Sequence, residues 1–155
     1  MKIINGTELA KTIKSILAIE IELMMKKYGR APKLAIILVG DDPASVQYVN
    51  SKKKSCSAIG IDCDLHILPN SIRQEELIKV IEGLNQDDTI DAILVQLPVP
   101  KHIDRNAILS AIDYRKDVDG LHPMNVGLLN SSQKGVIPCT PRGIISLLKE
   151  EGIEI

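Results

Sequence analysis

Short apolar segments alternate along the chain with longer segments in which apolar residues recur every three or four positions. Residues 34–39, 63–68 and 90–95 predict strands, of which the first and the third are apolar enough to be buried on both faces. The longer segments between them predict helices. This alternation is typical of β-α-β units, so we expect an α/β fold, a three-layer α/β/α domain with a mainly parallel sheet.

Residues that favour helix N-caps precede most of the predicted helices. The first helix is expected over residues 7–29, with its apolar residues on one face, and a second over about 43–59. Ser71 followed by Gln74 forms a capping-box pattern, and Pro141 suits the first turn of the last helix. The predicted N-caps are Thr7, Ser71, Asp104 and Thr140.

The second predicted helix carries two polar residues that share one face. Tyr48 and Lys52 are four positions apart, with Ser45 and Cys56 one turn away on either side. A phenol ring offers a platform for a flat heterocycle, and an amine can give or take a proton. Lys53 and Lys54 would favour the neutral amine by raising the local positive potential. The alternative interpretation is that residues 52–54 form the solvated side of an amphipathic helix.

Two further polar candidates lie after the third predicted strand, one at its carboxyl end, where parallel sheets bind their ligands, and one in a loop beyond the helix that follows. Gln96 comes directly after this strand, and its amide can bond a lysine and a substrate or merely satisfy loose backbone groups. Asp119 lies in a loop with Asp117 and Gly120. A carboxylate in such a loop suits an amino-pyrimidine edge, although Asp-Gly is also common in plain turns. No histidine is assigned a catalytic role.

Composition and charge narrow the classes of partner. The chain has 155 residues, 45% of them hydrophobic, yet it contains no Phe and no Trp, so its core must be aliphatic. It lacks the stacking rings of many RNA-binding proteins, and a net charge of -1 provides no general attraction to nucleic acid or anionic membranes. No apolar segment approaches the length of a membrane span or a secretory signal, so we expect a cytoplasmic protein.

Motifs for bound metals and nucleotides are absent from the sequence. Cys56, Cys63 and Cys139 show neither C-x-x-C spacing nor a nearby histidine pair, so we expect no metal site and buried or half-buried thiols. Neither G-x-G-x-x-G nor a P-loop occurs. The residues themselves therefore give no argument for a dinucleotide site.

Four blocks of sequence, in order and with matching spacing, resemble one enzyme family. Residues 39–54, 93–102, 116–127 and 138–143 are similar to the bifunctional methylenetetrahydrofolate dehydrogenase/methenyltetrahydrofolate cyclohydrolase family. The resemblance implies one-carbon metabolism: oxidation of 5,10-methylenetetrahydrofolate with NADP, then hydrolysis of the methenyl product to 10-formyltetrahydrofolate. The alternative is a folate-binding fragment without turnover. An anion or nucleic-acid contact through residues 52–54 is a third, weaker hypothesis.

The resemblance also assigns roles to individual residues. It implies that Lys52 is the catalytic acid and base, that Tyr48 stacks on the folate, that Gln96 bonds Lys52, and that Asp119 holds the pterin. The remaining pocket residues that it implies are Val95, Leu97 and Pro98.

Domain organisation follows from the same resemblance. Residues 1–120 would form the folate-binding catalytic domain, and residues 121–155 a connecting loop and helix leading toward an NADP-binding domain. That domain would lie beyond this chain, so NADP serves the full-length enzyme and none is expected on these residues. Tetrahydrofolate derivatives and a second copy in a homodimer are the expected partners.

Overall fold

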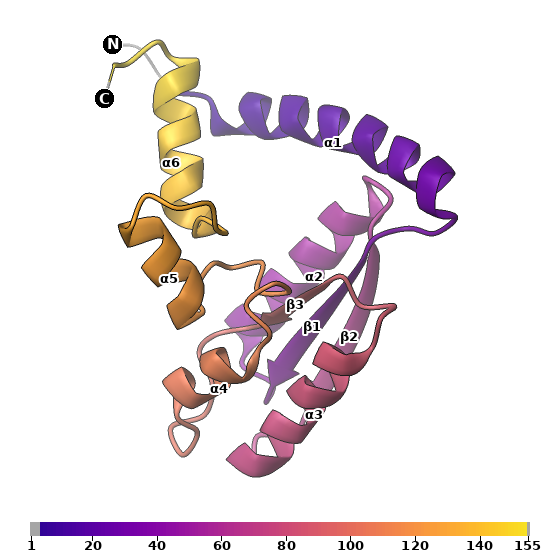
Figure 1. The fold of residues 1–155 in the computed structure, drawn as a ribbon, viewed down its shortest axis with the longest axis vertical. Coiled ribbons are helices and arrows are strands. Elements are labelled where there is room, and N and C mark those ends of the chain that lie inside the picture. Colours follow the sequence, from indigo (N-terminus) through magenta and orange to yellow (C-terminus); the bar gives the residue numbers. More distant parts are fainter. Residues whose placement is uncertain (1–3, 155) are drawn as a thin grey trace.

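A parallel sheet forms the centre of the molecule in residues 4–154, which the computed structural model describes (Figure 1). Its strands are β1 (Lys33–Val39), β2 (Asp62–Leu68) and β3 (Ala92–Val95), in the order β2-β1-β3. Ile37 of the central strand lies opposite a residue of each neighbour. The sequence prediction of a parallel sheet is confirmed.

Helices cover both faces of this sheet. Alternate residues of a strand point to opposite faces. Ile37 of β1 packs into the core beneath α3 and α4, whereas Ile36 packs with Val49 of α2 on the other face. Both sides of β1 are therefore buried, which explains its uninterrupted apolar run. The helices are α1 (Gly6–Tyr28), α2 (Pro43–Ser57), α3 (Gln74–Gln86), α4 (Arg105–Ala111), α5 (Pro123–Asn130) and α6 (Cys139–Glu150).

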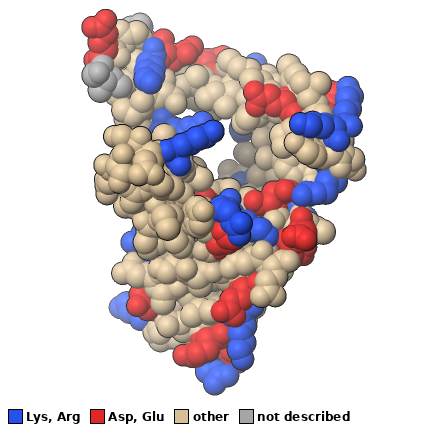
Figure 2. All heavy atoms as spheres, in the orientation of Figure 1, with Lys and Arg blue, Asp and Glu red and all other residues tan. Residues whose placement is uncertain are grey.

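Helix α1 lies outside the three layers and crosses over them (Figure 1). Its first residue, Gly6, lies against Leu147 of α6, and Ile21 packs beside Gly60 after α2. Between these contacts the molecule is hollowed, as the space-filling view shows (Figure 2). The apolar stripe of the predicted helix exists, but most of it is exposed, including Ile13, Ile16, Leu17, Leu23 and Met24.

Two predicted N-caps at the chain's first and third helices are wrong. Asn5, not Thr7, caps α1, because its side-chain oxygen accepts the backbone N–H groups of Thr7 and Glu8 at 3.2 and 3.3 Å. Asparagine is the stronger capping residue of the two. Helix α3 starts after Arg73, whose N–H is accepted by Glu76 at 3.1 Å, and not at Ser71.

At the starts of α4, α5 and α6 the structure agrees with only one of the sequence predictions. Asp104 caps α4 as expected, accepting the N–H of Asn106 at 2.8 Å. Helix α6 follows Pro138 and so begins before Thr140, the predicted cap. Helix α5 was not predicted, and His122 caps it through Nδ1. In the described part of the chain, none of the helices combines the length and apolarity that crossing a membrane requires.

Candidate active site

A pocket of about 660 Å³ lies on the α2 face of the sheet. Its walls come from α2, from the loop between α4 and α5 and from the start of α6, and apolar side chains of β1 and β3 contribute to its lining. The volume is in the range of small-molecule sites. The lining residues are Leu34, Tyr48, Lys52, Ser55, Cys56, Leu94, Val118, Asp119, Leu121, Pro138, Cys139, Thr140 and Pro141.

Lys52 is held in this pocket by an amide at the end of β3. Its Nζ donates to Oε1 of Gln96 at 3.0 Å, and both side chains are half-buried. Gln96 is fixed in turn, because its Nε2 donates to the carbonyl of Leu97 at 2.6 Å and its backbone N–H to Ile37 at 2.8 Å. The neutral amide orients the amine through this hydrogen bond. An amine in this position can accept a proton and donate one.

The neighbouring lysines behave differently from Lys52. Lys53 and Lys54 are exposed, so the solvated-helix interpretation applies to them. Tyr48, one turn before Lys52, lies on the pocket wall with 65% of its surface exposed. Its ring is thus accessible to a planar ligand that enters beside Lys52.

Asp119 lines the same pocket across from α2. Burial raises the pKa of its carboxyl above the ordinary value, and the charge of Asp117 adds to this effect, whereas Lys52 opposes it. The Lys52 ammonium and the Asp119 carboxyl therefore interact electrostatically across the pocket. Between them they offer a proton-transfer group and an acceptor for paired N–H donors.

Asp117 has a structural role that differs from that of Asp119. It is only 2% exposed, and its carboxylate accepts the backbone N–H of His122 at 2.9 Å and Nδ2 of Asn125 at 2.8 Å. The same amide of Asn125 donates to the carbonyl of Tyr114. Asn125 was missed by the sequence analysis, because its helix was not predicted. These bonds fix the shape of the loop that carries Asp119.

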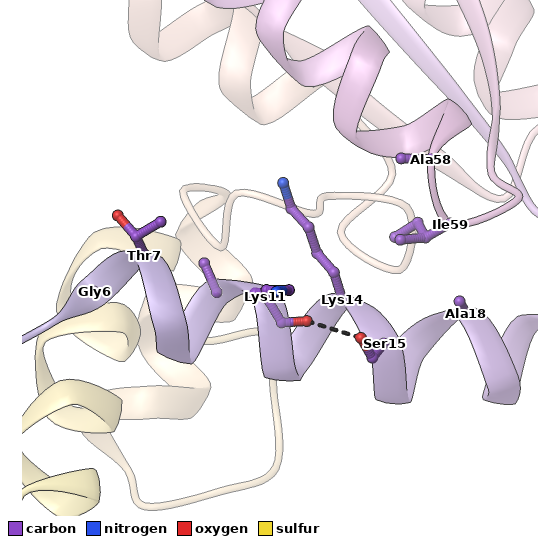
Figure 3. Close-up of a pocket in the computed structure, with 9 residues that line it drawn as sticks. Gly6, Thr7, Lys11, Lys14, Ser15, Ala18, Ala58 and Ile59 are labelled. Atoms are coloured by element: carbon purple, nitrogen blue, oxygen red, sulfur yellow. Dashed lines mark hydrogen bonds between the residues drawn. The ribbon is translucent and has the colours of Figure 1, made fainter.

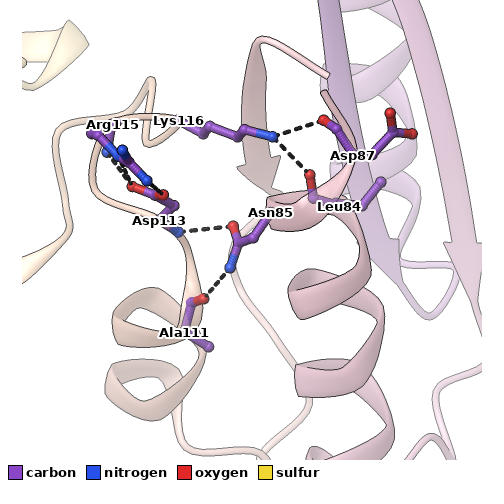
Figure 4. Close-up of polar contacts among 7 residues, drawn as sticks. All are labelled: Leu84, Asn85, Asp87, Ala111, Asp113, Arg115 and Lys116. Carbon is purple, nitrogen blue, oxygen red and sulfur yellow. Dashed lines mark hydrogen bonds and ion pairs between the residues drawn. The ribbon is translucent and has the colours of Figure 1, made fainter. Parts of the chain in front are cut away.

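The loop is also attached to the far layer of the domain (Figure 4). Lys116 Nζ donates to the carbonyls of Leu84 and Asp87, at the end of α3, at 3.0 and 2.8 Å. Asn85 of α3 donates to the carbonyl of Ala111 and accepts the N–H of Asp113, both at 2.8 Å. Arg115 pairs with the Asp113 carboxylate and lowers its pKa to about 2.

Gly120 lets two walls of the pocket meet. Its φ is +66°, and a Cβ there would lie 2.7 Å from the carbonyl oxygen of Val136 and 2.8 Å from the nitrogen of Pro138. Only glycine combines this conformation with so close a backbone approach. The contact brings the start of α6 against the loop after Asp119. Cys139, expected to be at least half-buried, is exposed at this rim, with its Sγ 3.6 Å from the carbonyl of Val118.

Other predicted site residues lie elsewhere. Val95 is buried in the core beneath α3 and α4, on the opposite face of the sheet from the pocket. Leu97 and Pro98, which are joined by a cis peptide bond, are not among the residues lining this pocket. Asp42, which follows β1, has a local structural role, since its side chain accepts the N–H of Ser45 and caps α2. Among the described residues, no group of His, Cys, Asp or Glu could hold a metal ion.

Some pocket residues were not predicted as binding residues, although the sequence contains patterns that point to part of them. Cys56 continues the four-residue spacing of Tyr48 and Lys52 along α2. The pocket segment 138–141 lies in the last of the four blocks described above. Leu34 and Leu94 could be predicted only as residues of buried strands. An apolar residue that lines a pocket cannot be distinguished by sequence from one that lies in the core.

Comparison with known proteins decides the family. Residues 4–119 match the model of the tetrahydrofolate dehydrogenase/cyclohydrolase catalytic domain. The chain belongs to this family. It is 52% identical over 154 residues to the bifunctional protein FolD of Acetivibrio thermocellus, a match that covers 99% of this chain and 54% of that protein. The chain thus spans about half the length of the curated relatives it matches.

Solved structures of family members share the fold described above. The bifunctional enzyme FolD, a methylenetetrahydrofolate dehydrogenase/cyclohydrolase from Campylobacter jejuni, is 46% identical with a TM-score of 0.94, over 99% of this chain and 54% of that one. The corresponding enzyme of Trypanosoma brucei, solved with NADP cofactor and an inhibitor, is 38% identical with a TM-score of 0.94 over 99% of this chain and 53% of that one.

Proposed function

We propose that this chain forms the folate site of a bifunctional enzyme that oxidises 5,10-methylenetetrahydrofolate and hydrolyses 5,10-methenyltetrahydrofolate to 10-formyltetrahydrofolate. The observation that carries the proposal is the Lys52–Gln96 hydrogen bond of 3.0 Å beside a pocket that Tyr48 and Asp119 also line. Membership of the family and the activities named for its relatives support it. One-carbon metabolism in the cytoplasm is the corresponding cellular role.

Each group in the pocket has a chemical role in this proposal. The Tyr48 ring stacks on the planar part of the folate, and Asp119 accepts N–H groups of the pterin's amino-pyrimidine edge. Lys52 lines the same pocket, one turn after Tyr48 on α2. Gln96 is a positioning residue, because it fixes the amine of Lys52 through Oε1.

Hydrolysis of the methenyl group needs a base first and an acid second. Water attacks the carbon that bridges N5 and N10, and neutral Lys52 takes one proton from it as the C–O bond forms. The resulting Lys52 ammonium then donates its proton to N5 as the bond between N5 and that carbon breaks. The remaining hydroxyl proton is released to solvent as the C=O bond forms, so the product is the 10-formyl compound, one proton is released overall, and Lys52 returns to its neutral form. Apolar side chains of the pocket, including Leu34 and Leu94, limit access of further water.

Oxidation of the methylene group requires NADP, which accepts a hydride when bound. The Trypanosoma brucei relative was solved with this cofactor. The present sequence has no G-x-G-x-x-G fingerprint, so its residues give no argument for a dinucleotide site. We therefore place NADP binding in the part of the full-length relatives that this chain does not span. Residues 1–120 form the folate-binding domain in this proposal, and residues 121–155 connect it to that part.

Residues 121–155 contribute more than a connection. Leu121 and the segment 138–141 line the pocket together with Lys52. The folate site is therefore built partly from the connecting segment. Formation of a homodimer, which the resemblance implies, is retained as part of the proposal.

The decisive experiment follows the absorbance of 5,10-methenyltetrahydrofolate with the parent chain and two lysine variants. Lys52→Met should slow hydrolysis about a hundredfold or more, because it removes the acid and base. Lys53→Met is the matched control, since this neighbouring lysine is exposed, and it should retain the parent rate. Equal rates for the parent and Lys52→Met would refute the assigned role.

The second candidate function is folate binding without turnover. It is favoured by the exposure of the pocket edge, where Tyr48 is 65% exposed and admits water to the reacting atoms. Calorimetry with tetrahydrofolate separates the two functions. Binding by the parent without any loss of the methenyl absorbance above the uncatalysed rate would establish this second function in place of the first.

A further inference from the structure

Two cysteines meet on the α2 side of the sheet, beside the active-site pocket. Cys56 lies in the last turns of α2 and lines the pocket, one turn after Lys52. Cys63 is the second residue of β2, and its side chain packs against the apolar cluster that contains Val49 of α2. Leu34 of β1 lies opposite Cys63 in the strand register and lines the pocket together with Cys56. Both thiols are free and half-buried.

A tight reversal of the chain brings the two cysteines together. The backbone N–H groups of Ile59 and Ile61 both donate to the carbonyl of Cys56, each at 3.0 Å. Residues 58–59 lie on the side of this turn toward α1 and line a separate hollow there (Figure 3). The chain therefore enters β2 directly beside the last turn of α2, with Cys56 on the pocket side.

The two thiols are in contact, and they differ in reactivity. Burial raises the pKa of the Cys63 thiol to about 12, its hydrogen bond to Cys56 adds to the rise, and the charge of Lys53 opposes it. Cys63 is therefore a protonated thiol near neutral pH and a poor first nucleophile. Cys56 lines the pocket, so a small oxidant that enters there meets this thiol first. A reversible disulfide needs this arrangement of one accessible thiol and a second one beside it.

We propose that Cys56 and Cys63 are a redox-sensitive modification site, at which hydrogen peroxide forms a disulfide that impairs the active-site pocket. Formation of the disulfide does not depend on the folate function proposed above, whereas its effect on turnover rests on that function. In a reducing compartment such a pair is oxidised only transiently, which suits a regulatory role.

The oxidation takes place in two steps. The Cys56 thiolate attacks one oxygen of hydrogen peroxide, the O–O bond breaks, and hydroxide leaves, so that Cys56 becomes a sulfenic acid. The Cys63 sulfur then attacks the Cys56 sulfur, the S–S bond forms, and the S–O bond breaks as the departing hydroxide takes the Cys63 proton. Two thiols and one peroxide thus give one disulfide and two waters, and the thiols supply both electrons. Dithiothreitol reverses the reaction by thiol–disulfide exchange.

The disulfide would act on Lys52 through the last turns of α2. An S–S bond of about 2 Å is shorter than a hydrogen-bond contact between thiols, so the end of α2 is drawn toward β2. Lys52 lies one turn before Cys56 and is positioned by its 3.0 Å bond to Gln96. A displacement of about 1 Å at a catalytic group can slow a reaction on the order of a hundredfold. We expect the oxidised chain to hydrolyse 5,10-methenyltetrahydrofolate at least about tenfold more slowly than the reduced chain.

The first measurement identifies the disulfide by peptide mass, without any folate. Trypsin releases residues 55–73 as one peptide, which contains both cysteines. After treatment with hydrogen peroxide this peptide should be lighter by the mass of two hydrogen atoms, and dithiothreitol should restore its mass. Cleavage before Asp62 should leave the two halves joined until the reductant is added. Cys139→Ser should retain this disulfide, and Cys63→Val should abolish it.

The second measurement follows the methenyl absorbance with reduced and oxidised protein. The parent chain should slow at least about tenfold on oxidation and recover with dithiothreitol. Cys63→Val is the matched control, because it keeps an apolar side chain of similar size in β2, and residue 63 does not line the pocket. This variant should hydrolyse at the rate of the reduced parent both before and after treatment with peroxide.

The possible outcomes separate the two proposals. A tryptic peptide of unchanged mass, or a disulfide from Cys56 to Cys139 instead, would overturn the inference. An equal loss of rate in Cys63→Val and the parent would overturn the effect of the disulfide on the pocket. A reduced parent chain without hydrolysis would overturn the proposed turnover and this effect with it, while the peptide mass still decides on the disulfide itself.

Discussion

Asn125 donates a hydrogen bond from Nδ2 to the buried carboxylate of Asp117 over 2.8 Å, which joins α5 to the loop that ends in the pocket. Neither side chain lines the pocket. The backbone of this loop also pairs with the sheet, since the N–H of Ile93 donates to the carbonyl of Lys116 at 2.8 Å. The position of Asp119 is therefore fixed in part by side chains that lie outside the pocket.

Replacing Asn125 tests this dependence. Asn125→Ala leaves the buried Asp117 carboxylate without its side-chain partner, and we expect a loss of about 2 kcal/mol in the free energy of unfolding. Urea denaturation measures it. Asn130→Ala, at the exposed end of the same helix, should change stability by less than about 0.5 kcal/mol. Similar losses for the two variants would contradict the structural role of Asn125.

Gln96→Glu tests whether a neutral partner is needed beside Lys52. A carboxylate at this position would pair with the ammonium and favour the protonated form, so hydrolysis should slow about tenfold near pH 7. The rise of the rate with pH should also move to higher pH. Gln47→Glu adds the same charge to an exposed position of α2 and should leave the pH profile in place. An unshifted profile for Gln96→Glu would count against the positioning role.

Asp119→Asn should affect stability and binding in opposite directions. The folded-state pKa of this carboxyl is raised, so ionisation destabilises the fold as pH increases above the ordinary value of 3.8. The asparagine variant lacks this cost and should be more stable than the parent at pH 7, with no difference below the ordinary pKa. Its affinity for folate should fall, because the amide replaces one of the two carboxylate oxygens by an NH2 group, which cannot accept the second of a pair of N–H groups. Urea titrations at the two pH values and calorimetry measure these effects.

Two glycines provide a matched pair for backbone conformation. Gly120→Ala forces a Cβ onto a residue with φ of +66° and within 3.0 Å of backbone atoms, so it should cost about 2 kcal/mol or more. Gly143→Ala lies within α6, where an added Cβ meets no atom within 4 Å, and it should stabilise the fold by about 0.5 to 1 kcal/mol. Thermal unfolding of the two variants should shift in opposite directions, and a shift in the same direction would refute this explanation.

Tyr48→Phe and Tyr48→Ala separate the ring from the hydroxyl. If the ring stacks on folate, the phenylalanine variant should keep the parent affinity and the alanine variant should lose about tenfold. Tyr28→Ala is the control, because Tyr28 is 63% exposed on α1, away from the pocket. If Tyr48→Phe loses as much affinity as Tyr48→Ala, the hydroxyl group and not the ring provides the contact, and the stacking role is refuted.

The layers of the fold could be predicted from sequence because they depend on local patterns. A continuous apolar run identified β1, since both of its faces are covered. Asp104 was identified as a cap because its side chain acts within its own turn. The exposure of the apolar stripe of α1 could not be predicted, because periodicity reveals a stripe and not what covers it. The eight residues of α5 are too few for a clear helical period.

The site was predictable where a residue follows directly from a strand or a helix turn. Tyr48 and Lys52 share a face of α2 by spacing, and Gln96 follows β3 directly. The wall opposite α2 depends on tertiary contacts that no local pattern encodes, above all the approach of Gly120 to the backbone of residues 136–138. The different roles of Asp117, which is buried, and Asp119, which lines the pocket, also depend on tertiary contacts. The two residues are the same amino acid in one loop and differ only in their surroundings.

The attachment of the loop to α3 gives the far layer of the domain an influence on the pocket. Helix α3 packs on the face of the sheet opposite the pocket, yet Lys116 holds its terminal carbonyls three residues before Asp119. A small tilt of α3 would therefore move the loop that carries Asp119, and with it one wall of the pocket. Substitutions beneath α3 can in this way alter substrate affinity without contacting the substrate, and a random search for altered specificity should recover them there.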